Sequence, residues 1–310
     1  RTVIENLAEE HRVCPYQLAS DLLAWVDACI ADIHHFYSFQ AGIAARLESW
    51  NKNWSILLDE AHNLPERALG MFSASLSKSD LMGARREASG PVRKALDGCN
   101  RQMLALNKLD WQEPDYKQFE AAPTQLVMAL TQYVGAMTEQ QAEAGAAQVG
   151  QSRLLEFYFS VLQFLRVLDD WGEDFRFELQ RQQADKQSLV VRLQCLDGSR
   201  LLAERQQKPL SVTAFSATAS PAHWMSNGLG FSVEAVFLPI ASPFGESQLS
   251  VTLNTRIDTR YRQRDHSLDE LTATIGEWLA LEQGNCIVYF PSYTYMNQVL
   301  ERLRPALEQQ

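Results

Sequence analysis

The sequence has 310 residues, of which 46% are hydrophobic and 21% charged, which is typical of a folded globular protein and excludes a wholly disordered chain. Its 28 Lys and Arg against 38 Asp and Glu give a net charge of −10, which argues against coating nucleic acid by bulk electrostatics but permits a local basic groove. No run approaches the roughly 18–20 uncharged apolar residues that cross a membrane, so no membrane association is expected.

Helices and short apolar runs alternate through residues 1–77. The periodicity predicts helices over residues 1–12, 17–25 and 41–50 and buried strands over 28–31 and 54–58. The second strand runs directly into Asp59-Glu60-Ala61-His62. Because open α/β sheets bind ligands at the carboxyl ends of their strands, this tetrapeptide is the strongest candidate for a site.

The hydrophobic pattern of the sequence changes over residues 78–205. Long amphipathic stretches, the longest at 154–168, predict a mainly helical domain, with frayed helix or loop over the Ala-, Gln- and Gly-rich residues 138–151. Strand-like sequence returns at 189–193 and 210–215, so the helical domain is predicted to be an insertion.

A new unit is predicted after Ser242-Pro243-Phe244-Gly245. Ser267-x-x-Glu270 has the pattern of a capping box opening a helix that ends near residue 282. A strand over 286–290 and a second helix over 293–307 follow. Helix, strand and helix in this order are typical of a doubly wound α/β domain.

Two motifs carry the chemistry. Phosphoryl transfer from a nucleotide needs an Asp to hold Mg²⁺ and a group that orients the attacking water, and Asp59 and Glu60 supply both kinds of side chain. The alternative is a strand end before a helix whose first turn favours acids. Ser216-Ala217-Thr218 follows the later strand, and by itself it is equally compatible with a capped turn.

Taken together, and with a helical insertion between them, these motifs resemble the DinG/XPD family of iron–sulfur superfamily 2 DNA helicases of the DEAH type. The resembling segments are Cys14-Pro15-Tyr16 (last cluster cysteine), residues 56–64 (Walker B), 216–221 (motif III), 242–244 (hinge), 259–264 (basic segment) and 290–293 (motif IV).

The resemblance implies a fold and an activity. The fold would be α/β, with parts of two RecA-like parallel-sheet motor domains and a large, mainly helical arch domain inserted in the first. Its segments would be residues 1–77 and 206–245 (first motor domain), 78–205 (arch) and 246–310 (start of the second motor domain). The activity would be that of an ATP-dependent 5′-to-3′ DNA helicase in repair or replication rescue.

The resemblance also implies roles for single residues. Asp59 would hold Mg²⁺, Glu60 would activate water beside ATP, and His62, Ser216 and Thr218 would couple the nucleotide state to the grip on single-stranded DNA. Cys14 would be one ligand of a [4Fe–4S] cluster. Part of the DNA path would be lined by Arg256, Arg260, Arg262, Arg264 and Tyr293. The alternative for these arginines is a solvated face.

Several family features are missing from the sequence. It contains no G-x-x-x-x-G-K-[ST] motif, and Cys14 is its only cysteine at a family cluster position, whereas a cluster takes four thiolates. The chain also begins with Arg1 and stops at Gln310 within a predicted helix, so an internal piece of a longer protein is expected. We therefore expect the isolated chain to hold no iron and to hydrolyse no ATP.

Two function hypotheses remain open on this basis. The first is a piece of an ATP-dependent helicase, and the second is a non-catalytic, helicase-derived DNA-binding or scaffolding module. The adjacent carboxylates of Asp59 and Glu60 favour the enzyme. The five scattered cysteines without a C-x-x-C pair argue against a disulfide framework and favour the cytoplasm.

Overall fold

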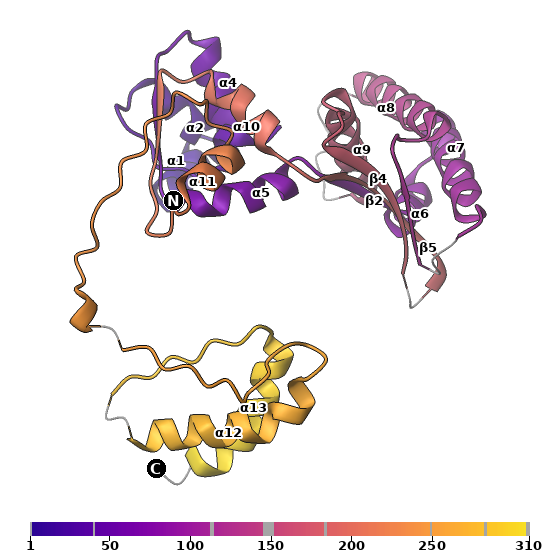
Figure 1. Ribbon diagram of the computed structural model, residues 1–310. Coiled ribbons are helices and arrows are strands. Elements are labelled where there is room, and N and C mark those ends of the chain that lie inside the picture. Colours follow the sequence, from indigo (N-terminus) through magenta and orange to yellow (C-terminus); the bar gives the residue numbers. More distant parts are fainter. Residues whose placement is uncertain are drawn as a thin grey trace. The chain divides into compact units, whose positions relative to one another are not determined.

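The structure is a computed structural model that describes residues 2–39, 41–111, 115–144, 152–182, 185–248, 250–281 and 284–307. The chain divides into two compact units, residues 1–237 and 238–310 (Figure 1). The predicted division into four segments is finer than this and stays a prediction. Within the described ranges, no helix has the length and apolarity needed to span a membrane.

The first unit opens with small helices around a short strand. These are α1 (Thr2–Glu10), α2 (Pro15–Asp21), a 3₁₀ turn (Leu22–Ala24), α3 (His34–Tyr37), α4 (Gly42–Ser49), β1 (Ser55–Leu58), a 3₁₀ turn (Ala61–Asn63) and α5 (Leu64–Met71). The predicted strand at 28–31 is wrong, because these residues form no ladder and Ile30 is fully exposed. An apolar run becomes a strand only when another strand accepts its backbone hydrogen bonds.

The parallel sheet of the predicted first motor domain, called the motor sheet below, pairs two segments that lie far apart in the sequence. β1 pairs in parallel with β6 (Ser211–Ala214), in a register that runs from Ser55 opposite Ser211 to Leu58 opposite Ala214. Parallel strands need a crossover connection, and here the whole inserted block provides it. The prediction that the block between these strands is an insertion within one parallel-sheet domain is thereby confirmed. β6 is followed by α11 (Ala222–Leu229).

Between β1 and β6 lies a block that is mainly helical, as predicted, but is built on a sheet. Its elements are β2 (Ala74–Ser77), α6 (Lys78–Glu87), α7 (Gly90–Asn107), β3 (Tyr116–Phe119), α8 (Thr124–Ala144), α9 (Arg153–Asp169), β4 (Phe175–Gln182), β5 (Asp185–Cys195) and α10 (Ser199–Gln206). The helices α7 and α8 pack against each other (Figure 1). Part of the predicted frayed segment is regular helix, since α8 runs to Ala144, and residues 145–151 lie outside the described residues.

The four strands form an antiparallel sheet in the order β2-β5-β4-β3. Side chains alternate along β4 and β5, so that Phe177, Leu179, Val191 and Leu193 are fully buried while their neighbours are not. The prediction that 189–193 is a strand is confirmed. The strand lies within the inserted block, as its place in the predicted segment 78–205 implies, because β5 pairs with β2 and β4.

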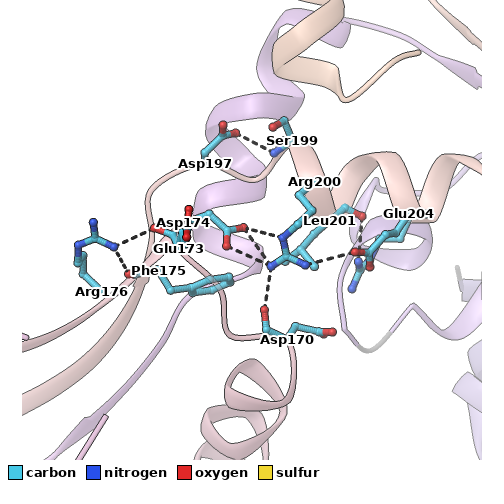
Figure 2. A network of polar contacts seen from close by, with 11 residues as sticks. Asp170, Glu173, Asp174, Phe175, Arg176, Asp197, Ser199, Arg200, Leu201 and Glu204 are labelled. Atoms are coloured by element: carbon cyan, nitrogen blue, oxygen red, sulfur yellow. Dashed lines mark hydrogen bonds and ion pairs between the residues drawn. The ribbon is translucent and has the colours of Figure 1, made fainter. Parts of the chain in front are cut away.

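A network of polar contacts joins α10, where the chain leaves this block, to the segment between α9 and β4 (Figure 2). The guanidinium of Arg200, on α10, donates to both Asp174 carboxylate oxygens at 3.2 Å, to the Asp170 carbonyl at 2.8 Å and to Glu204 at 3.2 Å. Just before it, a Cβ on Gly198 would lie 2.9 Å from the Cβ of Ala68. Glycine thus allows α10 to approach α5 closely.

In its described residues, the second unit contains a 3₁₀ turn (Glu246–Gln248) and two helices, α12 (Arg264–Leu281) and α13 (Tyr293–Leu307), the latter as predicted. Its small core consists of Leu268, Ile275, Tyr295, Val299 and Leu303. The predicted capping box is wrong, because α12 begins three residues before Ser267, whose buried hydroxyl donates to the Asp258 carbonyl at 2.6 Å. The predicted strand at 286–290 is also absent, and in the described part of this unit no other strand offers it a partner.

Candidate functional site

The two predicted motifs lie at the same edge of the motor sheet. β1 ends at Leu58 and β6 at Ala214, and because the strands are parallel both following loops leave from their carboxyl ends. The Phe215 amide donates to the Leu58 carbonyl at 3.0 Å, and the Ala61 amide donates to the Phe215 carbonyl at 3.1 Å. The backbone therefore ties the acidic loop to the Ser-Ala-Thr loop.

The acidic loop makes a sharp turn at Glu60. This residue has a φ of 48° and a ψ of 44°, in the left-handed region, which costs a non-glycine residue about 1–2 kcal/mol. The Glu60 amide donates to the Asp59 carboxylate at 2.7 Å. Both carboxylates are exposed, whereas Leu58 before them and Ala61 after them are buried. The turn is thus anchored on both sides while its two acids face solvent.

His62 connects the two loops. Its Nδ1 lies 2.7 Å from the Ser216 hydroxyl and 3.3 Å from a Glu60 carboxylate oxygen. The Ser216 hydroxyl accepts from the Thr218 amide at 3.1 Å. A single ring nitrogen carries at most one proton, so it donates to Glu60 or to Ser216 but not fully to both. Glu60, His62, Ser216 and Thr218 form one network, and Asp59 joins it through the Glu60 amide.

The acidic loop has the donors that Mg²⁺ prefers. Mg²⁺ is usually held by one or two carboxylates together with waters and substrate phosphates, and not by a cage made only of protein groups. Asp59 has no ion pair with Lys or Arg within the described residues, so its carboxylate is available. In the same ranges, no set of three or more His, Cys, Asp or Glu side chains is placed to hold a metal. The residues present fit a magnesium ion shared with a nucleotide.

The cysteines do not fit a complete iron–sulfur cluster. Cys14 is an exposed free thiol at the start of α2, and Cys29 is also exposed. Cys99 and Cys195 are buried, which raises the pKa of each thiol to about 12. The described residues bring no three cysteines together. A [4Fe–4S] cluster takes four thiolates, so this chain's residues alone do not build one.

The five predicted DNA-contacting residues all lie in the second unit. Two of the arginines are paired with carboxylates, Arg260 with Asp258, and Arg256 with Glu270 at 3.4 Å. Arg264 lies over the ring of Tyr295 at 5.2 Å and donates to the Thr259 carbonyl. The remaining two, Arg262 and Tyr293, are exposed.

Sequence reasoning missed Phe215. Its amide and its carbonyl both bridge to the acidic loop, so it sets the distance between the two motifs. The contribution comes from the backbone and leaves no side-chain signal in the sequence. Only the strand alternation before Ser216 indicated that the chain leaves the sheet at this point.

Comparisons with known proteins agree with this geometry. Residues 2–81 match the DEAD_2 family model. A solved structure titled "XPD_Helicase" is 18% identical, with a TM-score of 0.57 over 97% of this chain and 52% of that one. The Xpd4 structure of S. tokodaii is 16% identical, with a TM-score of 0.53 over 88% of this chain and 55% of that one. The chain thus spans about half the length of these structures.

The parallel pair and the mainly helical block inserted between its strands form the fold that this chain shares with these solved structures. The DEAD_2 match of residues 2–81 and the shared fold agree with the resemblance to the DinG/XPD family that the motifs indicated. The predicted α/β class with a parallel sheet and a mainly helical insertion is confirmed.

Proposed function

We propose that this chain is part of an ATP-dependent DNA helicase that couples ATP hydrolysis to 5′-to-3′ movement along single-stranded DNA, in repair or replication rescue. The observation that supports this most is the 2.7 Å contact between His62 and Ser216. It joins a DEAH sequence to a Ser-Ala-Thr loop that lies 154 positions further along the chain. A structural turn has no need of such a link.

In this proposal the acidic loop prepares the hydrolysis of ATP. Bound Mg²⁺ would neutralise charge that develops on the phosphates. Asp59 would hold the ion through its exposed carboxylate. Glu60 would orient the attacking water and accept its proton, which requires a carboxylate within hydrogen-bond reach of that water. The left-handed turn fixes the Glu60 backbone, so that its position does not depend on side-chain packing.

His62 would transmit the state of the site to the second loop. When Nδ1–H donates to Glu60, Ser216 loses a donor, and when it donates to Ser216, Glu60 is released. A change in the charge around Glu60 would therefore alter the hold on residues 216–218. Thr218 shares this hold through its amide bond to Ser216.

The remaining parts of the proposal rest on the family resemblance. Cys14 would supply one thiolate of a [4Fe–4S] cluster. The four arginines and Tyr293 of the second unit would contact single-stranded DNA, and the protein would work in the cytoplasm. A non-catalytic DNA-binding module is the second hypothesis. The left-handed backbone at Glu60 favours the enzyme, because strained backbone is typically kept at functional sites.

The test is ATP hydrolysis by the full-length protein, with and without single-stranded DNA. Glu60→Gln should lower kcat by about 10²–10⁴-fold, because the amide keeps the size of the side chain but cannot accept the proton. ATP binding should be retained. Glu66→Gln, a change at an exposed glutamate of α5, is the matched control and should hydrolyse ATP normally. Near wild-type turnover of Glu60→Gln would contradict the proposal.

A further inference from the structure

The outward face of α7 carries a row of cations on an otherwise acidic chain. Residues 85–108 hold six Lys and Arg against two acids, a net charge of +4, while the whole chain has −10. Four of these cations lie on or at the end of α7, and we call them the α7 basic row: Arg93, Lys94, Arg101 and Lys108. All four side chains are exposed.

The helix geometry aligns these cations. Lys94, Arg101 and Lys108 recur every seven residues, so neighbouring members lie about 10.5 Å apart along the axis and turn by only about 20°. The buried residues of α7 occupy the opposite side, where Val92, Leu96 and Met103 reach the core. The basic row therefore lies on the side of the helix that faces away from the core.

No carboxylate of the described residues neutralises the row. The one acid within α7, Asp97, accepts from Arg85 of α6 at 2.5 Å. In the ranges that the structure describes, no member of the row forms an ion pair. Arg256 and Arg260 of the second unit differ in this respect, because each is held by its own carboxylate.

We propose that the α7 basic row binds the phosphodiester backbone of a nucleic-acid strand. Regularly spaced cations that track a backbone are the usual electrostatic element of single-strand binding. Each cation that neutralises a phosphate releases condensed counterions, which drives binding. The inference deepens the proposed function by adding a strand contact in the inserted block. It depends on nucleic-acid binding but not on ATP hydrolysis.

The occupant is a nucleic acid and not a membrane. A helix that lies on a membrane needs Trp, Phe or Leu on its outward side. The positions one turn from Arg101 are Asp97, Gly98, Leu104 and Ala105. Only Ala105 is exposed, and Leu104 is half-buried, so this side offers little apolar surface. An acidic protein segment would match the charge without using the seven-residue spacing, and the experiment separates it from a nucleic acid.

The test is binding of a fluorescent oligothymidylate to the 310-residue chain, measured by anisotropy at several salt concentrations. The variant Lys94→Gln/Arg101→Gln/Lys108→Gln keeps good helix formers at all three positions. It should reduce the slope of log K against log[salt] by about 2, since each single-strand phosphate bound by a cation contributes about 0.7. At about 50 mM salt the affinity should fall roughly tenfold for each cation removed.

Two controls make the result specific. Lys52→Gln removes an exposed cation elsewhere in the first unit and should leave the slope unchanged. Glu66→Gln, at an exposed position of α5, should also leave it unchanged. Because the assay contains no ATP, failure of the ATPase proposal and failure of this one are distinguishable. The inference is overturned if the wild-type chain does not bind the oligonucleotide, or if the triple variant and Lys52→Gln behave alike. Polyglutamate that competes as well as the oligonucleotide would also overturn it, because the occupant would then be an acidic protein segment.

Discussion

The two sheets of the first unit differ in how they are held. The antiparallel sheet of the inserted block has four strands, and the alternate side chains from Phe175 to Leu179 in β4 and from Leu189 to Cys195 in β5 are completely buried. The parallel pair β1–β6 has two strands, and Leu57, in the middle of β1, is 75% exposed. The candidate chemistry lies at the end of the less buried sheet.

The region expected to contribute most of the stability is therefore not the region that carries the candidate site. Burial of apolar area is the largest favourable contribution to folding, so most of the stability of the first unit should reside in the inserted block. The motor pair is fixed by the register of β1 on β6 and by the backbone bonds around Phe215. Variants in the two sheets should therefore have different consequences.

The largest expected effect on stability is that of truncating a buried side chain in the antiparallel sheet, compared with truncating an exposed side chain in the parallel pair. Phe177→Ala, in β4, should lower the free energy of unfolding by about 3–5 kcal/mol, because it removes a fully buried ring that packs on Phe119. Leu57→Ala, in β1, should change it by less than about 0.5 kcal/mol. Urea unfolding followed by circular dichroism measures both. Equal decreases would contradict the contrast between the sheets.

A smaller decrease in the free energy of unfolding is expected where α10 packs closely on α5, between the two regions. Gly198→Ala places a methyl group 2.9 Å from Ala68 and 3.3 Å from the Phe72 ring, so we expect a decrease of about 1–3 kcal/mol in unfolding free energy. Gly70→Ala in α5 is the matched control, since its Cβ would enter open space. It should be neutral, or stabilising by up to about 1 kcal/mol. A neutral Gly198→Ala would show that α10 does not need its close approach to α5.

The inserted block should also become less stable at alkaline pH. Burial raises the pKa of Cys99 from its ordinary value of 9.0 to about 12. The stabilisation is complete below pH 9 and disappears as the pH rises toward 12, because only the unfolded thiol releases its proton in that range. The slope for one such group is about 1.4 kcal/mol per pH unit. Cys99→Ala should reduce the slope of unfolding free energy between pH 9 and 11, and an unchanged slope would contradict this assignment.

Local sequence predicted those parts of the molecule whose partners lie nearby or whose pattern is strong. The helices at α4, α9 and α13 and the strand β1 were predictable from periodicity. The pairing of β1 with β6 followed from the two motifs, although the intervening block separates them. The predictions failed at residues 28–31 and 286–290, where an apolar run has no strand beside it.

The antiparallel sheet and the site geometry were harder to foresee. β4 and β5 alternate with period two, yet the surrounding helical sequence hid the short β2 and β3. The residue types of the candidate site were predictable from motifs. The left-handed backbone of Glu60 and the double bridge of Phe215 were not, because both arise from how the loops meet after the sheet has formed.

The most direct test of the central claim is strand unwinding by the full-length Ser216→Ala protein. Basal ATP hydrolysis is expected to stay within about threefold of wild type, because Asp59 and Glu60 are intact. Unwinding is expected to fall at least about tenfold, because the substitution removes one hydrogen bond worth about 1.4 kcal/mol. Ser211→Ala is the matched control, since it breaks a 2.8 Å hydroxyl contact with Ser55 at the opposite end of the same strand pair. Wild-type unwinding by Ser216→Ala, or an equal decrease in Ser211→Ala, would contradict the claim that the His62–Ser216 contact couples the two loops.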